Sequence, residues 1–325
     1  MKILVTGAAG FIGGHVSKLL TEFDHEVIGF DNFSEYYSPR MKKAHLSENA
    51  FLPIEEIDIS NRELVFQRFN EISPDCVIHL AAQGGVRAST TDPMPYITAN
   101  QIGFLNVLQA SEKAGVRKFI YASSSSVYGE GLETPFKEYS ILPAPKSLYA
   151  LSKLSNENIA KNLPYAGVER IGLRFFTVYG PWGRPDMAVF RLLASALLGR
   201  EFILTANLNV KRDFTFVADV ASTIHSIIQS AHSFENEIFN VAGSNPYSLT
   251  QLFQLLDSHG ISPNIVNAKV DLMDVNLTHG SIEKLTHFGL SVPQTTLEVG
   301  IQRTWEWIQR IDIDDLRDWF EYSSR

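Results

Sequence analysis

The chain has 325 residues, of which 45% are hydrophobic and 20% charged, as in an ordinary soluble globular protein. This length allows one large α/β domain, or a large and a small domain that share a core. The net charge of -8 argues against a surface for nucleic acid or for an anionic membrane. It does not exclude an anionic small molecule, which needs only a few local Arg or Lys side chains.

Cysteine content and apolar runs bear on the compartment. Cys76 is the only cysteine, which excludes an intrachain disulfide and favours a reducing compartment. The first apolar run, residues 3–5, is too short for a signal peptide. No apolar run approaches the roughly 18 residues that a membrane span needs. We therefore expect a cytoplasmic protein.

Strand-like and helix-like patterns alternate along the first half of the chain. Short apolar runs indicate strands at residues 3–5, 27–30, 76–80, 119–122 and 170–176. Apolar residues at helical spacing indicate helices at residues 12–23, 97–113 and 149–162. This alternation predicts an α/β fold with a doubly wound parallel sheet of Rossmann type.

The second half of the chain is less regular. We expect a strand or loop followed by a helix at residues 214–231, and one more strand at 239–241. The predicted Rossmann domain comprises residues 1–176 and 213–243, and a smaller α/β domain for the substrate comprises 177–212 and 244–325. The charge-rich end, residues 311–325, is either a surface helix or a frayed terminus.

A glycine-rich stretch, Thr6–Gly13, joins the first strand to the first helix. Gly7, Gly10 and Gly13 stand where a dinucleotide loop needs a tight turn, a close approach to pyrophosphate, and close packing of helix on strand. The helix N-terminus offers amide groups and a positive dipole end to phosphates. Asp31 ends the second strand, where a carboxylate accepts the ribose hydroxyls and repels a 2′-phosphate, so NAD is favoured over NADP. The alternative is a tight turn that binds no ligand.

Tyr149 and Lys153 are four residues apart, so on a helix they lie on one face, about one turn apart. A lysine ammonium and an oxidised nicotinamide both favour the tyrosine phenolate and bring its pKa toward the working range. The serine run at residues 123–126 can supply a hydroxyl that holds the substrate oxygen. Alone, this spacing is more often a solvated helix face. Together with the glycine loop it predicts proton transfer by Tyr149.

Longer strings of sequence carry a family resemblance, namely Asp31–Tyr37, His79–Gln83 with Gly85–Arg87, Tyr121–Gly129 and Leu173–Ala188. By these strings the chain resembles the extended short-chain dehydrogenase/reductase superfamily over nearly its whole length. Within that superfamily it resembles the nucleotide-sugar epimerases, and most closely the UDP-glucuronate 4-epimerases. The resemblance implies an isomerase that uses NAD and no metal and acts on a UDP-uronate. It also implies a homodimer formed through the helices that start near Ile97 and Leu148.

The resemblance assigns a set of residues to the cofactor. The glycines are expected at the pyrophosphate, Asp31 at the ribose and Asp58 near the adenine, although Asp58 could also be a simple strand-end cap. The full set comprises Gly7, Gly10, Phe11, Ile12, Gly13, Asp31, Asn32, Asp58, Ile59, Leu80, Ala81, Ala82, Gln83, Asn100, Tyr149 and Lys153.

It also assigns residues to catalysis and to the nucleotide sugar. Tyr149 is expected to be the acid/base, Lys153 to bind the nicotinamide ribose and tune that tyrosine, and Ser124 to hold the sugar 4-oxygen. Arg212 is expected at the diphosphate, with a plain surface charge as the alternative, and Asp274 at the nucleotide ribose. Arg87 either serves the substrate or pairs with a nearby acid.

The implied reaction moves the C4 hydroxyl proton to Tyr149 and the C4 hydride to NAD, then returns hydride to the other face of the sugar. Related 4,6-dehydratases place an Asp-Glu pair where this chain has Ser125 and Ser126, and related decarboxylases place a Glu at position 126. The alternatives of a decarboxylase or dehydratase are therefore less favoured. A non-catalytic NAD-binding regulator is also less favoured, because Tyr149, Lys153 and Ser124 are all present.

A 4-keto glucuronate is a β-keto acid that tends to lose carbon dioxide, so an epimerase must restrain its carboxylate. Our candidates for this restraint are Ser125, Ser126, Thr177 and Arg184, because hydroxyls and a guanidinium can fix a carboxylate in orientation. For Arg184 the alternative is that it only braces its own loop.

Overall fold

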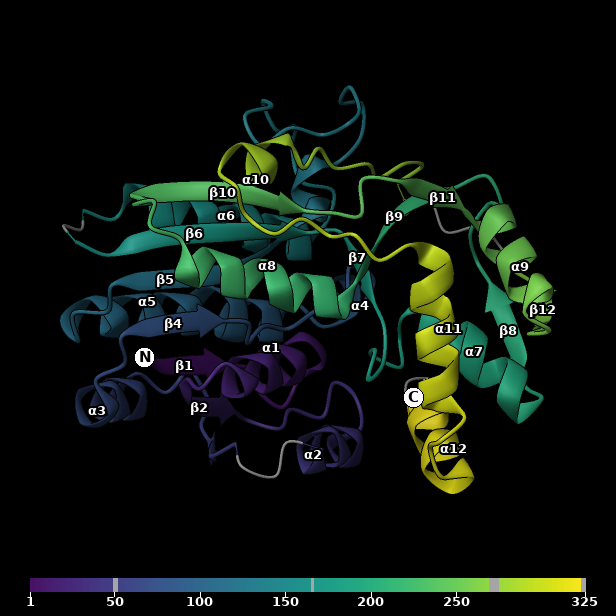
Figure 1. Ribbon diagram of the computed structural model, residues 1–325, viewed down its shortest axis with the longest axis horizontal. Helices are drawn as coiled ribbons and strands as arrows, with labels where there is room; N and C mark the ends of the chain where they lie inside the picture. Colours follow the sequence, from purple (N-terminus) through teal and green to yellow (C-terminus); the bar gives the residue numbers. More distant parts are fainter. Residues whose placement is uncertain (49–51, 165–166, 269–274, 323–325) are drawn as a thin grey trace.

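The large sheet of the protein is parallel throughout and follows the predicted doubly wound plan. The structure is a computed structural model that describes residues 1–48, 52–164, 167–268 and 275–322. Seven strands lie in the order β10-β6-β5-β4-β1-β2-β3 (Figure 1). They are β1 (Lys2–Thr6), β2 (Glu26–Asp31), β3 (Ile54–Glu56), β4 (Cys76–His79), β5 (Lys118–Ser124), β6 (Glu169–Phe175) and β10 (Asn236–Val241). All six strands predicted for this sheet are confirmed, and β3 is an addition.

Both faces of this sheet are buried, which explains why its strands are apolar runs rather than alternating ones. Ile3 and Val5 point into one core, whereas Leu4 points into the other, as the twofold periodicity of a strand requires. The first core is covered by α1 (Phe11–Glu22) and α8 (Val217–Gln229), which pack on each other. The second is covered by α3 (Arg62–Ile72), α5 (Phe104–Lys113) and α6 (Leu148–Asn162).

The helix predicted at residues 97–113 is wrong as a single α-helix. The structure has a π-helix, η1 (Tyr96–Gly103), that leads directly into α5. A π-helix inserts extra residues per turn without interrupting the apolar spacing, so the periodicity could not separate the two. The helix predicted at 12–23 runs one residue earlier, and the one predicted at 149–162 begins at Leu148.

The smaller part of the chain lies to the right in Figure 1. Its three-stranded sheet has the order β11-β9-β7, and β12 pairs with β8. The elements are β7 (Thr177–Tyr179), α7 (Ala188–Leu198), β8 (Glu201–Leu204), β9 (Lys211–Phe216), β11 (Pro246–Ser248), α9 (Leu249–Ser258), β12 (Asn264–Asn267), α11 (Leu297–Ile308) and α12 (Ile313–Tyr322). Although it comes late in the chain, α10 (Glu283–His287) packs against β10 of the large sheet (Figure 1). Because β9 pairs with β7 and β11, we propose the same two-domain division with the boundary between β9 and α8 instead of at residue 213.

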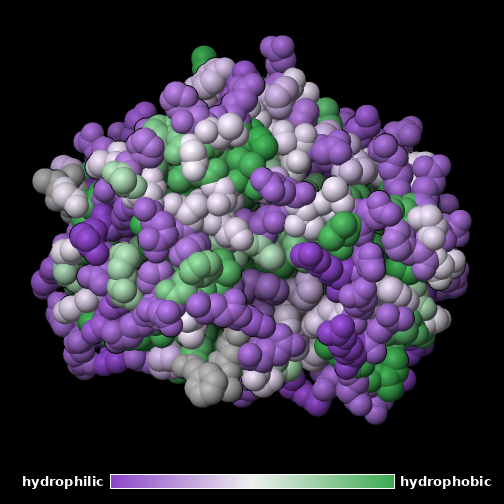
Figure 2. Space-filling model, in the orientation of Figure 1, coloured by the Kyte–Doolittle hydropathy of each residue, from purple (hydrophilic) through white to green (hydrophobic). Residues whose placement is uncertain are grey.

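The C-terminal helix α12 is part of the folded body. Leu316, Trp319 and Phe320 are buried on one face of it, against α7 and the Trp182 ring. Of the two alternatives for the charge-rich end, a surface helix or a frayed terminus, the helix is confirmed. It covers residues 313–322, and one of its faces is packed. The face of the molecule in Figure 2 is mostly hydrophilic, with hydrophobic residues scattered between. Among the described residues, no helix combines the length and apolar character that a membrane span requires.

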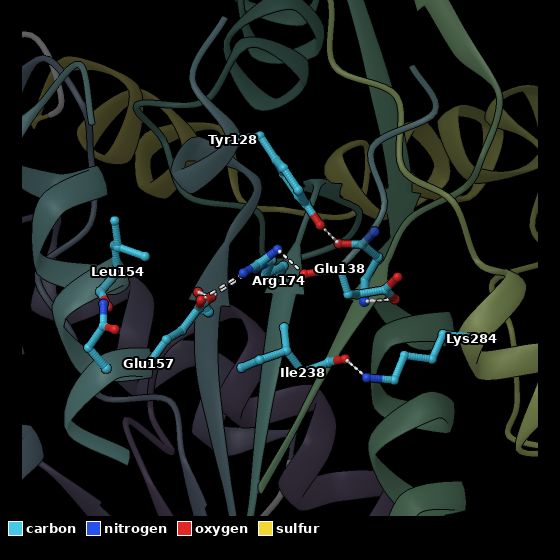
Figure 3. Close-up of polar contacts among 10 residues, drawn as sticks. Tyr128, Glu138, Leu154, Glu157, Arg174, Ile238 and Lys284 are labelled. Carbon is cyan, nitrogen blue, oxygen red and sulfur yellow. Dashed lines mark hydrogen bonds and ion pairs between the residues drawn. The ribbon is translucent and has the colours of Figure 1, made fainter. Parts of the chain in front are cut away.

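A buried ion pair joins α6 to β6, the second strand from one edge of the large sheet (Figure 3). The Arg174 guanidinium donates to both carboxylate oxygens of Glu157, from Nε at 2.9 Å and from Nη2 at 2.8 Å. Ser123 at the end of β5 donates to the same carboxylate at 2.5 Å, and the Tyr128 ring lies 4.7 Å from the guanidinium. The carboxylate thus ties α6 to β5 and β6 together, close to the carboxyl ends of both strands.

We expect Glu157→Gln to lower the free energy of unfolding by about 3 kcal/mol, because the Arg174 charge stays buried without a compensating carboxylate. The change is read as a drop in the apparent melting temperature. The control is Glu321→Gln, which breaks the exposed pair with Arg200 and should cost at most about 0.5 kcal/mol. Equal shifts for the two variants would show that the buried pair has no special role in stability.

Candidate active site

A cleft of about 520 Å³ opens at the carboxyl ends of the large sheet's strands. In open α/β sheets, ligands bind at this edge, where loops from neighbouring strands meet. Of the residues predicted for cofactor and substrate, those that line the cleft are Gly7, Gly10, Phe11, Ile12, Gly13, Asp31, Asn32, Asp58, Ile59, Leu80, Ala81, Ala82, Gln83, Ser124, Ser125, Ser126, Tyr149, Lys153, Thr177 and Arg184. The cleft therefore brings together residues that are up to 177 positions apart in the chain.

Three of the predicted residues lie elsewhere in the described structure. Asn100 is buried behind the loop that follows β4, where it accepts from the Gln83 amide at 2.7 Å and donates to the Gln83 carbonyl at 3.0 Å. Arg87 donates to the Thr205 hydroxyl at 2.9 Å, and Arg212 donates to the Val275 carbonyl at 2.7 Å. Asp274 lies outside the described residues.

The glycine loop holds the first helix close against the sheet. Gly7 has φ +72°, and a Cβ there would lie 2.7 Å from the Ala81 amide nitrogen. A Cβ on Gly13 would collide with the Gly7 carbonyl oxygen. Gly10 is the N-cap of α1 and has no side chain that could fill the space above the first turn. The turn thus leaves room for a diphosphate at the positive end of the helix dipole.

At the adenosine end of the cleft, Asp31 is fixed by the backbone. Its carboxylate accepts from the Ala9 amide at 3.1 Å and from the Phe33 amide at 2.8 Å, and the Lys42 ammonium lies 3.9 Å away. Burial lowers the pKa of Lys42, and the Asp31 charge opposes that shift. A carboxylate oxygen has more than one lone pair, so Asp31 retains capacity for ribose hydroxyls.

Next to it, Asp58 is held in its ionised form. Partial burial would raise its pKa, but hydrogen bonds from Ser60 and from Asn32 keep the pKa below the usual value. The Asn32 amide donates to Asp58 at 3.1 Å, and the Ser60 amide donates at 2.8 Å. Asp58 therefore both accepts hydrogen bonds in the turn before α3 and lines the cleft. A strand-end cap and a position near the adenine, the two roles that the sequence left open, are compatible.

Tyr149 and Lys153 lie on one face of α6, as predicted. Ser147 caps the helix by accepting from the Ala150 amide, which fixes where the first turn begins. The Lys153 ammonium donates to the Ala122 carbonyl at 2.9 Å and lies 6.0 Å from the centre of the Tyr149 ring. Burial lowers the pKa of Lys153 to about 8, so this side chain is mostly charged at neutral pH.

Opposing influences act on the Tyr149 phenol, and its pKa lies above the usual value for a tyrosine. Burial raises the pKa of Tyr149, whereas its hydrogen bond with Ser124 and the nearby Arg184 charge lower it. Ser124 ends β5 and also donates to the Ser126 hydroxyl at 3.1 Å. Ser124 and Arg184 thus oppose the effect of burial on the phenol, and the role expected for Lys153 stays a prediction.

Some cleft residues were not predicted from the sequence. The most polar of them, Ser34, Tyr36, Tyr37 and Lys42, follow β2, and Met187 follows Asp186. They stand in or beside the strings Asp31–Tyr37 and Leu173–Ala188, so those strings were the available signal. Tyr36 donates to Asp186 at 3.1 Å, and Asp186 accepts from Arg184 Nε at 3.0 Å and Nη2 at 2.7 Å. Arg184 therefore does brace its loop, and it lines the cleft as well.

The residues that line the cleft fit an NAD molecule. The glycine turn, the carboxylate of Asp31 and the open space above Gly10 fit the adenosine diphosphate half, and Tyr149, Lys153 and Ser124 lie at the far end of the same cleft. Among the described residues, no group of three or more His, Cys, Asp or Glu side chains is arranged to hold a metal ion.

Comparisons with known proteins agree with this fit. The model of the NAD dependent epimerase/dehydratase family matches residues 3–242. UDP-glucuronate 4-epimerase 4 of Arabidopsis thaliana is 36% identical over 329 residues, which cover 94% of this chain and 74% of the plant protein.

Solved structures with this fold hold nucleotide sugars. UDP-glucuronic acid 4-epimerase from Bacillus cereus, in complex with UDP-glucuronic acid and NAD, has a TM-score of 0.87 at 31% identity and covers 95% of this chain and 99% of its own. UDP-glucose 4-epimerase from Thermotoga maritima, with UDP-glucose, has a TM-score of 0.85 at 32% identity with the same coverage. The chain belongs to the NAD-dependent epimerase/dehydratase family, and it is an NAD-dependent nucleotide-sugar epimerase.

Proposed function

We propose that this epimerase interconverts UDP-glucuronate and UDP-galacturonate at C4. The observation that carries the proposal is the place of Arg184, which lines the same end of the cleft as Tyr149 and Ser124 and is close enough to lower the pKa of Tyr149. A guanidinium beside the reacting centre suits an anionic sugar, since it offsets the cost of desolvating a carboxylate. Relatives that are UDP-glucuronate 4-epimerases, such as the plant and Bacillus cereus proteins, support the same choice.

In this proposal the protein's own groups move one proton and hold one oxygen. Tyr149 accepts the proton of the C4 hydroxyl as C4 becomes a ketone, and Ser124 donates a hydrogen bond to the same oxygen. A bound NAD would supply the acceptor and donor of the C4 hydride. Because burial raises the pKa of Tyr149, the phenolate needs positive charge close by, which the Lys153 ammonium and Arg184 supply.

The carboxylate must survive while C4 is a ketone. Decarboxylation would break the C5–C6 bond, release carbon dioxide and leave the electron pair in an enolate that takes a proton at C5. A fixed guanidinium stabilises the carboxylate charge that this step removes. Thr177 at the start of β7 and the hydroxyls of Ser125 and Ser126 line the cleft beside Arg184, so they are our remaining candidates for orienting the group.

The decisive experiment incubates purified enzyme with UDP-glucuronate and follows C4 configuration by NMR and product mass by mass spectrometry. We expect an epimer of unchanged mass, whereas loss of carbon dioxide or of water would identify a decarboxylase or a dehydratase. Tyr149→Phe should lower kcat by at least about 100-fold, because general acid/base catalysis is worth that much. Tyr139→Phe removes the hydroxyl of an exposed tyrosine and should leave kcat unchanged.

Arg184→Leu should weaken the binding of UDP-glucuronate by roughly 100-fold and the binding of UDP-glucose far less, because a charged hydrogen bond is lost only with the uronate. Isothermal titration calorimetry with both nucleotide sugars measures the difference. Arg117→Leu removes an exposed guanidinium far along the sheet and serves as the matched control. Equal losses for the two ligands would refute the assignment of Arg184 to the carboxylate.

We also propose that the chain is a homodimer and that its partner covers η1 and α6. These two helices pack together, and Ile97 and Ile102 of η1 and Leu151 of α6 are exposed, as is Met94 just before η1. Exposed apolar patches mark protein interfaces, and α6 also carries Tyr149 and Lys153. A dimer formed here would therefore steady the catalytic helix.

Leu151→Glu should convert a dimer into a monomer, because the charge would be buried without a partner at the interface. Light scattering after size-exclusion chromatography measures the mass. Ile203→Glu introduces the same charge at an exposed isoleucine of β8 and should leave the dimer intact. A wild-type protein that runs as a monomer would contradict this proposal.

A further inference from the structure

The side chain of Asp186 joins the two walls of the cleft. It accepts from Arg184 through both carboxylate oxygens, at 3.0 and 2.7 Å, and it accepts from the Tyr36 hydroxyl at 3.1 Å. Tyr36 belongs to the loop that follows β2, on the adenosine side, whereas Asp186 and Arg184 belong to the loop before α7. Two segments 150 positions apart in the chain thus meet at a single carboxylate.

This contact fixes the guanidinium of Arg184 on more than one side. Nε and Nη2 face Asp186, and the Tyr36 ring lies 5.4 Å from the guanidinium carbon. Nη1 lies against Gly84, where a Cβ would collide with it. The orientation of the guanidinium is therefore set by its neighbours, and Nη1 is the nitrogen that neither oxygen of Asp186 holds.

The loop that carries Arg184 is itself tied to the adenosine side. The Trp182 ring stacks on the His45 ring of α2 (Pro39–Ser47) at 4.8 Å and an interplanar angle of 14°. Arg40 of the same helix pairs with Asp315 of α12 at 3.1 Å. Trp182 holds a positive φ of 60°, a conformation that a bulky residue keeps only where packing enforces it. The His45 stacking is thus a second link from the β2–α2 segment to the loop of Arg184, and the Arg40 pair ties α2 to α12 as well.

The charges at this bridge are stable at neutral pH. Burial would raise the pKa of Asp186, but the Arg184 charge and the hydrogen bonds keep it below the usual value, so the group is a carboxylate. Burial raises the pKa of Tyr36, so its hydroxyl remains a donor. The bridge therefore has a fixed direction of hydrogen bonding, from Tyr36 and Arg184 to Asp186.

We propose that Asp186 is a positioning residue that directs Arg184 toward the sugar carboxylate, and that Tyr36 links this pair to the loop over the bound dinucleotide. The inference rests on the proposed function for the identity of the anionic group. It adds that the side chain of Asp186 couples restraint of the sugar carboxylate to retention of the cofactor. A guanidinium released from Asp186 still carries its charge, but it no longer holds the uronate in one orientation while C4 is a ketone.

The first test uses Asp186→Asn with UDP-glucuronate. We expect kcat for epimerisation to fall by at least about tenfold, since a charged hydrogen-bonded pair is lost, with a smaller change in KM. The fraction of product that has lost carbon dioxide should rise by at least about fivefold. Asp186→Glu keeps the charge and should restore part of the wild-type ratio. Asp257→Asn changes an exposed acid of α9 and is the matched control.

The second test uses Tyr36→Phe, which keeps the ring under Arg184 and removes only the hydroxyl. Bound NAD should exchange with labelled NAD about fivefold faster, as expected for the loss of one hydrogen bond, whereas Tyr139→Phe should leave the exchange rate unchanged. This measurement needs no nucleotide sugar, so it remains valid if UDP-glucuronate is not a substrate.

The outcomes separate the two proposals. If the wild type does not epimerise UDP-glucuronate, the proposed function fails, and the NAD exchange rate of Tyr36→Phe alone decides whether the bridge acts on the cofactor. If the wild type does epimerise it, product ratios and NAD exchange within twofold of the controls would overturn the inference. Should Asp186→Asn not fold, Tyr36→Phe carries both readouts.

Discussion

The position of α6 against the sheet is the constraint on which the rest of the site depends. Glu157 and Arg174 form a pair that is buried between that helix and β6, and Ser123 donates to the same carboxylate. A buried charge pair tolerates little displacement, because each charge would lose its only compensation in a medium of low dielectric. The register of α6 along the sheet is therefore fixed one or two turns beyond Tyr149 and Lys153. Those two side chains reach the carboxyl end of β5 as a consequence.

A second constraint acts from the opposite wall of the cleft. The segment from the end of β2 through α2 contacts the smaller part of the chain through Tyr36, Arg40 and His45. Each contact is modest by itself, and the exposed pair of Arg40 is worth little. Together these three contacts restrict how the two walls of the cleft can move relative to each other. A cofactor that is oxidised and reduced within one turnover benefits from such a site, since it never has to leave.

The sequence predicted the large sheet well because the two features that specify it, apolar strand runs and a glycine turn, each lie within a short stretch of the chain. Strands that are buried on both faces read as apolar runs, and the glycine turn at residues 7–13 has a spacing that few other structures require. The π-helix at residues 96–103 could not be predicted, because its apolar spacing is that of an α-helix with a local shift. The burial of α12 also depends on a distant partner, since its apolar face becomes informative only once the Trp182 ring is placed beside Trp319.

The candidate site shows the same division between local and distant determinants. Tyr149, Lys153 and Ser124 could be found because helix spacing and a strand end place them. The link from Tyr36 to Asp186 could not, since no pattern within either segment specifies a contact across 150 positions. For the same reason no local pattern predicts that Arg184, 35 positions further along the chain, lowers the pKa of Tyr149 and so opposes the effect of burial.

This division bears on how one scaffold serves several reactions. In the proposed mechanism, Tyr149, Lys153 and Ser124 serve oxidation and reduction at C4 whatever the substituent at C5. The fate of the 4-keto sugar depends instead on groups placed around C5 and C6. Ser125 and Ser126 are hydroxyls that neither donate nor accept a proton readily near neutral pH, so elimination of water lacks an acid and a base there. Arg184, held by Asp186, adds a positive charge on the same side, and such a charge favours the carboxylate over its loss. In this proposal a few side chains at one end of the cleft decide between isomerisation and elimination. The rest of the fold serves the oxidation and reduction at C4 that both reactions share.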